Sequence, residues 1–279
     1  MPPQDPIPLG PATPLPNGKA TYATGGGLAL ITLTNPPANG YTLVMMRDLD
    51  EAILRARFDE AVQVIVLAGE GEKFFCAGAD ISMLHEVTPE FKYAFCLHAN
   101  ETLLRLEHTP KLVIAALGGH CVGGGLEIAL ACDLRIARKA SGRTGLPEVT
   151  LGVLPGTGGT QRLARLVGTS KAIELMAGGR LFDYEEALAL GLVNELREAA
   201  DDATFLAAVL ETARGYCTPA KAALAVGLIK RAVQTGAQLP LEAGLALERE
   251  LQARLFASAD AREGVAAFVE RRAPNFLGR

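Results

Sequence analysis

Hydrophobic and polar positions follow two different periods along the first half of the chain. Residues 28–34 show the alternation that is typical of a β-strand. The apolar residues of segment 43–58 instead recur at helical spacing, and residues 62–68 form the next apolar run. Because strand, helix and strand recur in this order, the pattern predicts parallel strands that are joined by helical crossovers.

The same two patterns continue toward the C-terminus. A second long helix is predicted over residues 89–106, a buried strand over 112–117 and a further strand over 135–138. Beyond Gly158 the pattern becomes mainly helical. The helices predicted there cover residues 159–166, 171–176, 184–190, 203–216, 221–234, 241–256 and 261–270. We therefore predict an α/β core over residues 27–200 and an α-helical region over residues 201–279.

The N-terminal residues differ in composition from the rest of the chain. The first 18 residues contain seven prolines and neither Lys nor Arg. A secretory signal needs a basic start and an apolar centre, and a transit peptide is rich in Arg, so neither is expected. Residues 1–26 are predicted to form an extended, proline-rich tail.

Composition and charge narrow the possible functions. The chain has 279 residues, of which 49% are hydrophobic, and a formal net charge of −4, which gives no reason to expect nucleic-acid binding. Its longest uncharged apolar passage, residues 112–126, is too short and too rich in glycine to span a membrane. Five cysteines without a Cys-x-x-Cys pair and four histidines without a His-x-x-x-His pair indicate reduced thiols and no metal site. A cytoplasmic location is expected from these features.

A glycine-rich stretch with one acid follows the strand that is predicted at residues 112–117. Gly123, Gly124 and Gly125 allow a ligand to approach the backbone closely, and free N–H groups at the start of a helix bind negative charge. Glu127 lies among apolar residues, so burial should raise its pKa and suit it to proton exchange near neutrality. A lone Gly-Gly-Gly-x-Glu is also compatible with a tight turn and a glutamate that is paired with a core arginine.

Five blocks of sequence carry a resemblance to a known family. From about Gly27 to Arg279 the chain resembles the crotonase, or enoyl-CoA hydratase/isomerase, superfamily. Four blocks match in order, and a fifth is similar to the C-terminal signature of the family. The blocks are KFFCAGADI at 73–81, GGGLE at 123–127 with Cys132-Asp133, GLPE at 145–148, LGVLPGTGGTQR at 151–162, and SADAREGVAAF at 258–268. Any one block could arise by chance, whereas five in order with similar separations identify the family.

The resemblance implies a fold, an assembly and a substrate class. The expected fold is a crotonase-type spiral of repeated ββα units with an α-helical C-terminal trimerisation region. The expected assembly is a homotrimer or a dimer of trimers, although the apolar stripes of the C-terminal helices would by themselves indicate a core within one chain. The substrate would be an acyl-CoA thioester, so CoA is part of the substrate and no separate cofactor is implied.

The resemblance also implies two catalytic acids and two oxyanion-hole amides. Glu127 and Glu148 match the glutamates of members that hydrate a double bond, where one deprotonates a bound water and the other supplies a proton to C2. The backbone amides of Ala79 and Gly124 match the two donors that stabilise the enolate oxygen. The presence of both glutamates favours an enoyl-CoA hydratase that adds water to a 2-enoyl-CoA.

Six further residues match substrate-binding positions of the family. Lys73 matches a lysine near the CoA phosphates, although a solvated surface lysine is equally compatible with the sequence. The amide of Gly156 matches a contact that places the catalytic water. The remaining four would line the adenine and pantetheine path, mostly through the backbone, and are Ala77, Asp80, Ile81 and Ser82.

Two other functions stay open at this point. A Δ3,Δ2-enoyl-CoA isomerase would need only Glu148 as a proton shuttle. A member without turnover could bind acyl-CoA or act as a scaffold, although its glutamates and glycines would then have no role. The length, branching and polarity of the acyl chain cannot be deduced from the sequence.

The chain departs from the pattern of the family at two places. Residues 139–145 are about one residue longer than usual, so the strand that is expected to carry Glu148 should absorb an insertion, for example as a bulge at Gly142. Residues 39–41 read Asn-Gly-Tyr where many members have Asn-Ala-Leu. Because that loop commonly borders the bound nucleotide or acyl group, Tyr41 is expected to affect substrate choice.

Overall fold

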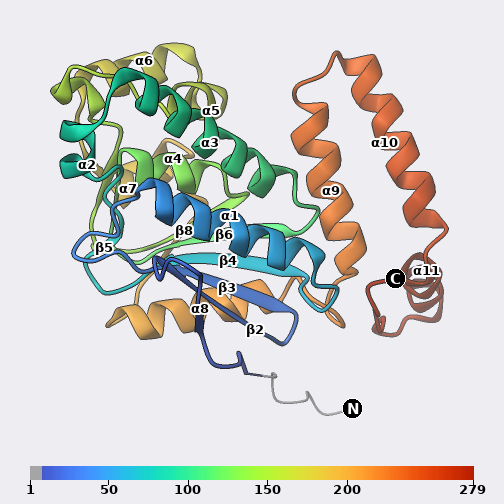
Figure 1. Cartoon of the computed structure of the whole chain (residues 1–279). Coiled ribbons are helices and arrows are strands. Elements are labelled where there is room, and N and C mark those ends of the chain that lie inside the picture. The colour runs from blue at the N-terminus through green and yellow to red at the C-terminus, as the bar shows by residue number, and fades with distance from the viewer. Residues whose placement is uncertain (1–7) are drawn as a thin grey trace.

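The computed structural model describes residues 8–279 and shows a mixed α/β protein with two sheets (Figure 1). The larger sheet has the strand order β1-β2-β3-β4-β6-β8-β11, and the smaller one has the order β10-β9-β7-β5. The strands of the larger sheet are β1 (Thr13–Pro14), β2 (Ala20–Gly25), β3 (Leu28–Leu33), β4 (Val64–Gly69), β6 (Leu112–Leu117), β8 (Leu134–Arg138) and β11 (Glu195–Arg197). The strands of the smaller sheet are β5 (Phe74–Cys76), β7 (His120–Val122), β9 (Arg143–Gly145) and β10 (Phe182–Asp183).

The predicted helices are all present, with ends that shift by a few residues. The helices of the first part, which include the additional α2, α4 and η1, are α1 (Leu43–Phe58), α2 (Ile81–Glu86), α3 (Pro89–His108), α4 (Gly124–Leu130), α5 (Gly159–Val167), α6 (Thr169–Gly178) and α7 (Tyr184–Ala189), with a 3-10 helix η1 (Glu148–Leu151) before α5. The C-terminal helices are α8 (Asp202–Arg214), α9 (Ala223–Gly236), α10 (Leu241–Phe256) and α11 (Ala259–Glu270).

The chain winds as a spiral in which each turn adds one strand to each sheet. β4, β6 and β8 pair in parallel in the larger sheet, whereas β5, β7 and β9, which follow them in the chain, pair in parallel in the smaller one. One or more helices lead from each pair of strands to the next. The predicted spiral of repeated ββα units is therefore confirmed.

Burial on both faces explains why β4 is continuously apolar. Val64, Val66 and Ala68 belong to the cluster that contains Phe205 and Val209 of α8. The intervening β4 residues point to the opposite face, where the cluster includes residues of α1 and α3. Each fully buried Val, Leu or Ile side chain contributes about 1.5–3 kcal/mol to folding. Parallel strands that are covered on both faces have this composition.

The smaller sheet was not predicted, because its strands have only two or three residues. Glycines mark the corners where the chain passes from one sheet to the other. A Cβ atom at Gly69 would lie 2.3 Å from the carbonyl oxygen of Phe75, and one at Gly119 would lie 2.4 Å from that of Lys73. No side chain fits at either corner, so the two backbones can cross closely.

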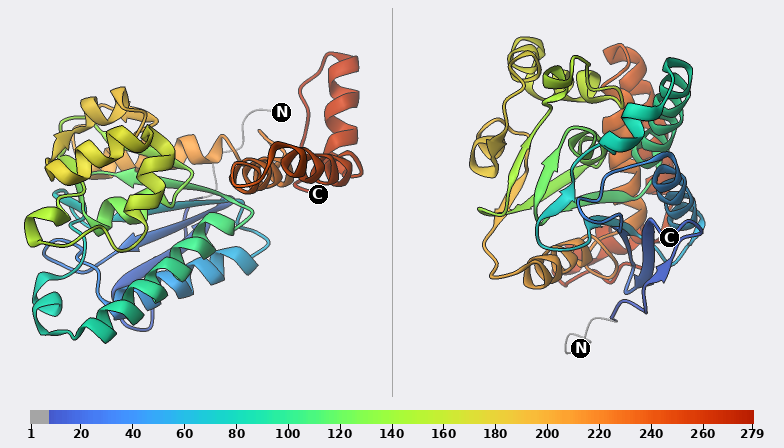
Figure 2. Two further views of the ribbon diagram at one scale, coloured as in Figure 1. Left: turned by 90° about the horizontal axis from the view of Figure 1, so that it is seen from above. Right: turned by 60° about the vertical axis from the view of Figure 1, so that its left-hand side comes forward.

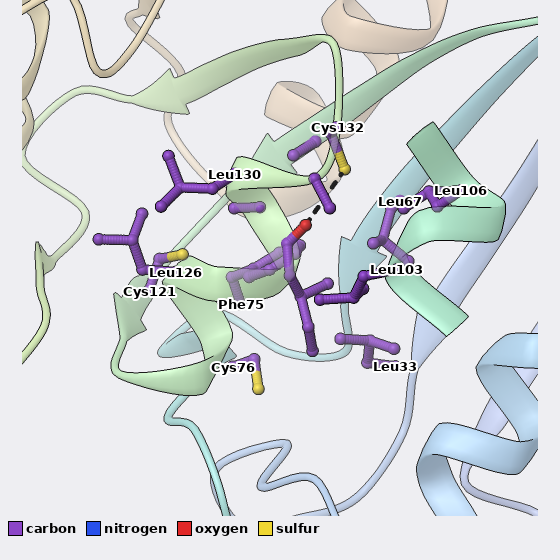
Figure 3. Packing of buried hydrophobic residues seen from close by; sticks show 14 of the residues in the cluster. Leu33, Leu67, Phe75, Cys76, Leu103, Leu106, Cys121, Leu126, Leu130 and Cys132 are labelled. Carbon is purple, nitrogen blue, oxygen red and sulfur yellow. Dashed lines mark hydrogen bonds between the residues drawn. The ribbon is translucent and has the colours of Figure 1, made fainter. Parts of the chain in front are cut away.

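The helix α4 is packed among buried hydrophobic side chains (Figure 3). Leu126 and Leu130 of this helix pack in the same cluster as Phe75 of β5 and Leu103 of α3. All seven residues of α4 are buried. The glutamate on this helix is therefore placed by packing from several elements rather than by a surface loop.

The N-terminal tail is shorter than predicted. Residues 1–7 lie outside the described part, but Ala20–Gly25 form β2, which pairs antiparallel with β3. Gly26 and Gly27 turn the chain between the two strands with φ values of +59° and +83°. Ala20 and Ala23 are buried in this hairpin, although small side chains give only a weak apolar signal. Before β2, Thr13–Pro14 form β1, which pairs with β2, and Leu15 is buried in the core, so residues 13–25 belong to the folded body.

The C-terminal region has two different environments. The helix α8 packs on the larger sheet, although we predicted it within the helical region, so the α/β body extends beyond residue 200. The helices α9, α10 and α11 lie to one side of this body (Figures 1 and 2). A buried ion pair of 2.9 Å between Lys230 of α9 and Asp133 attaches this helix to the body. No helix within residues 8–279 combines the length and the hydropathy that a membrane span needs.

Candidate active site

Glu127 is buried at the centre of the candidate site. It lies on α4 with 1% of its surface exposed, and its Oε1 atom accepts hydrogen bonds of 2.7 Å from the amides of Thr157 and Gly159. Burial raises the pKa of Glu127, although these two hydrogen bonds and the charge of Arg162 oppose the rise. This carboxyl is therefore easier to protonate than a solvated glutamate.

Among the described residues, Glu127 forms no salt bridge with a core arginine, which was the alternative role left open by the sequence. The guanidinium group of Arg162, whose charge acts on Glu127, forms a salt bridge of 2.7 Å with Glu107 and donates to the carbonyl oxygen of Thr157 at 3.1 Å. Arg162 therefore holds the loop that binds Glu127, and the carboxyl itself is held by amides.

Glu148 approaches the same region from a different element. Its side chain is half-buried, and within the described part of the chain its Oε2 atom has no hydrogen-bond partner. Its Oε1 atom lies 3.0 Å from the position that a Cβ atom would take at Gly123. Burial, followed by the negative charge of Glu127, raises the pKa of Glu148 to about 7. The charge of one acid thus acts on the other, as expected for two carboxyls at one site.

Glu148 does not lie on a strand, and no bulge forms at Gly142. The strand β9 ends at Gly145, and Glu148 begins the 3-10 helix η1 after Pro147. Proline has no N–H group to continue a sheet ladder, which explains why the strand stops. In the turn before β9, Ala140 has a φ of +55°, and Gly142 precedes the strand.

The two predicted amide donors lie next to each other. Among the described residues, neither the N–H group of Ala79 nor that of Gly124 has a backbone acceptor. A Cβ atom at Gly78 would lie 2.9 Å from the nitrogen of Gly124, so the loop before α2 touches the start of α4. Gly123 caps α4 with a φ of +56°, which an L side chain rarely adopts. The backbone thus leaves two N–H groups available at one place.

The other predicted residues lie on two neighbouring segments. Ala77 leads into α2, and Asp80 caps this helix by accepting a hydrogen bond of 3.0 Å from the amide of Met83. Ile81 and Ser82 are exposed on the first turn of α2, and Lys73 is exposed before β5 with its ammonium group 5.4 Å from the ring centre of Phe74. Gly156 lies beside Thr157, on the loop that holds Glu127.

Two residues that support the site, Thr157 and Gly159, were missed at the sequence level, whereas Tyr41 was noted only for an expected effect on substrate choice. Thr157 and Gly159 bind the carboxyl of Glu127, and the hydroxyl groups of Tyr41 and Thr157 lie 2.8 Å apart. The glycine-rich segment around residue 157 was the only signal. Its composition indicates a loop but not which side chain that loop binds.

Replacing Glu148 by Gln is expected to stabilise the protein at alkaline pH. Between its ordinary pKa of 4.5 and its folded pKa of about 7, Glu148 holds its proton more tightly when folded, so its ionisation removes stability as pH rises. Gln cannot ionise. After screening is allowed for, E148Q should be roughly 1–2 kcal/mol more stable near pH 8. Urea unfolding at several pH values tests this, and an equal gain below about pH 4.5 would contradict it.

Comparison with known proteins gives a consistent result. A family model described as enoyl-CoA hydratase/isomerase matches residues 23–279. A short-chain-enoyl-CoA hydratase of Clostridium acetobutylicum is 38% identical over 88% of this chain and 93% of its own length. An (E)-benzylidenesuccinyl-CoA hydratase of Thauera aromatica is also 38% identical, over 92% of this chain and 98% of its own. A crystal structure of an enoyl-CoA hydratase from Geobacillus kaustophilus HTA426 is 44% identical and superposes with a TM-score of 0.90 over 94% of this chain and 97% of its own.

Proposed function

The chain belongs to the enoyl-CoA hydratase/isomerase family, and from this premise we propose that it is an enoyl-CoA hydratase. It would add water across the 2,3 double bond of a 2-enoyl-CoA thioester to give a 3-hydroxyacyl-CoA. The observation that carries this proposal is the pair of acids. Glu127 and Glu148 come from different elements, both have a raised pKa, and the charge of the first acts on the second.

The amides of Ala79 and Gly124 would hold the thioester oxygen of the substrate. When the water oxygen bonds to C3, electrons move from the double bond onto this oxygen, and an enolate develops. Fixed N–H groups that have no other acceptor stabilise this charge without reorganising, and one such donor contributes about 3 kcal/mol. The N–H groups of Ala79 and Gly124 meet this requirement.

The two carboxyls would carry the proton transfers. Glu127, when ionised, orients the water and takes one of its protons while the hydroxyl oxygen bonds to C3. Glu148, when protonated, gives its proton to C2 as the enolate collapses. Its pKa of about 7 leaves a large fraction protonated near neutral pH. Proton exchange between the two acids or with solvent then restores the starting state, and this chemistry requires no metal or redox cofactor.

The CoA portion would follow the segment that leads from β5 into α2. Ala77, Asp80, Ile81 and Ser82 present their backbone beside the amide of Ala79. Because the carboxyl of Asp80 caps α2, its contribution to binding would come from its main chain. Lys73 is exposed and able to reach a phosphate as a flexible point charge. The amide of Gly156 would help to place the water.

Hydration assays with a panel of thioesters test this function. We expect the protein to hydrate crotonyl-CoA or another 2-enoyl-CoA from a set that varies in chain length, branching and ω-carboxylate. The range matters because one relative is named for a benzylidenesuccinyl-CoA substrate. Conversion of 3-enoyl-CoA without hydration would identify an isomerase instead. Tight binding of CoA esters without any turnover would indicate a scaffold.

The C-terminal helices support the proposal of a homotrimer or a dimer of trimers. Leu241, Val265, Phe268 and Val269 expose between 58% and 85% of their surfaces, whereas Leu251 on α10 is buried within the chain. Burying such side chains between subunits would be favourable. Light scattering is expected to give three or six times the chain mass of 29.3 kDa. A mass of one chain at working concentration would contradict this assembly.

A further inference from the structure

Tyr41 contacts both segments that carry the proposed oxyanion-hole amides and the loop that holds Glu127. It lies in the loop before α1 and is only 2% exposed. We propose that Tyr41 is a positioning residue that couples the oxyanion-hole amides to the loop that holds Glu127. This inference rests on the proposed hydratase function and adds a residue to its machinery.

The main chain of Tyr41 fixes the first oxyanion amide. Its N–H group donates to the carbonyl oxygen of Gly78 at 2.9 Å, and its carbonyl oxygen accepts from the amide of Asp80 at 3.1 Å. These two bonds form an isolated parallel bridge that is centred on Ala79. The bridge holds the loop on both sides of Ala79 and leaves the N–H group of Ala79 without a backbone acceptor among the described residues.

The ring of Tyr41 lies directly against the second oxyanion residue. A Cβ atom at Gly124 would lie 2.0 Å from the Cε1 atom of Tyr41, so the ring occupies the space that a side chain would need. The ring of Phe95 lies on α3 at a centroid distance of 5.5 Å from that of Tyr41. Because close packing restricts each ring, the backbone of Gly124 has a fixed neighbour on this side.

The hydroxyl group of Tyr41 reaches the anchor of Glu127. It lies 2.8 Å from the Oγ1 atom of Thr157, whose amide donates to Glu127 at 2.7 Å. Burial, together with the charge of Glu127, raises the pKa of Tyr41, so its hydroxyl keeps its proton. Thr157 is 1% exposed, and the loss of this buried bond would leave a hydroxyl without a partner. Leucine at position 41 could not make this contact.

A double-mutant cycle tests the role of the hydroxyl. Tyr41→Phe keeps the ring, and Thr157→Val removes only the second hydroxyl with little change of shape. Each single variant is expected to lower kcat roughly tenfold and to leave KM within about twofold. The double variant should be no slower than either single one, because both remove the same bond. Tyr22→Phe is the matched control, since the buried hydroxyl of the half-buried Tyr22 has no partner in the described structure.

A second measurement isolates the ring from the hydroxyl without requiring turnover. Acetoacetyl-CoA forms an enolate that absorbs in the near ultraviolet, and its thioester oxygen would occupy the oxyanion hole. Tyr41→Leu should reduce this enolate signal about tenfold or more, whereas Tyr41→Phe should keep it within about twofold.

The outcomes separate this proposal from the proposed function. An unchanged kcat in Tyr41→Phe, or losses that multiply in the double variant, would overturn the coupling through the hydroxyl. A full enolate signal in Tyr41→Leu would overturn the role of the ring. A purely structural role would lower thermal stability while kcat per folded site stayed constant. If the wild type binds acetoacetyl-CoA but hydrates no enoyl-CoA, the hydratase function fails, and the enolate signal still decides the role of Tyr41.

Discussion

Glu127→Gln is expected to lower kcat for hydration of a 2-enoyl-CoA by about a thousandfold. A positioned general base contributes on the order of 10²–10⁴ to the rate, and the neutral amide of Gln cannot take a proton from water. The substitution is conservative for the fold. Its amide oxygen can accept the same two N–H groups, those of Thr157 and Gly159, that now bind Oε1 at 2.7 Å. Steady-state assays at saturating substrate measure this loss.

The same variant separates a hydratase from an isomerase. Moving a double bond between positions 3 and 2 requires a proton shuttle at C2 but no water, so an isomerase should keep most of its activity in Glu127→Gln. Glu86→Gln is the control, because it removes an equal charge from an exposed side chain of α2. If hydration by Glu127→Gln stays within tenfold of the wild type, Glu127 is not the base.

The larger elements could be predicted because their patterns are long and strongly periodic. The helix α1 was predicted with the bounds that it has, and the apolar run of β4 reflects its burial on both faces. Of the hairpin β2–β3, only β3 was predicted. β2 was missed because it contains small and polar residues beside its turn. The strands of the smaller sheet are too short to show a period. Their positions are set by backbone crossings at glycine corners such as Gly119.

The site was predictable in part, for a related reason. Sequence order and spacing identified Glu127, Glu148 and the two glycine-rich loops as a set. The environment of each acid could not be read in the same way, because it depends on contacts between distant segments. Tyr41 and Thr157 are 116 positions apart, yet their hydroxyl groups meet beside Glu127. No local pattern encodes such a pairing, which exists only once both sheets are packed.

Glu148 was assigned to a strand, which is the wrong element, because the sequence does not show how the segment before it packs. An inserted residue before β9 could be absorbed in the strand or in the turn, and these alternatives are equivalent in sequence. In the structure β9 has no bulge, and the turn before it contains Ala140 with a φ of +55°. The strand thus keeps its register with β7, and Glu148 reaches the site from η1. Ala140 itself lies outside the proposed catalytic apparatus.

Glu148→Gln is expected to abolish both hydration and exchange of the C2 proton, with a loss of about a thousandfold or more in each. Hydration needs Glu148 as the acid at C2, and exchange of the C2 protons of a saturated thioester such as butyryl-CoA needs the same carboxyl as base and acid in turn. Glu127→Gln should lose hydration but retain exchange, because exchange does not require an oriented water. Proton NMR in D2O measures exchange, and absorbance of the enoyl thioester measures hydration.

The pairing of these two readouts assigns the roles of the acids independently of protein stability. The Oε2 atom of Glu148 has no partner among the described residues, so Gln introduces no broken hydrogen bond at that atom, and the folded protein should persist. Loss of exchange in both variants would show that the two carboxyls act as one coupled unit, as expected if they share a proton. Retention of exchange in Glu148→Gln would remove Glu148 from C2 and leave the proton donor to another group.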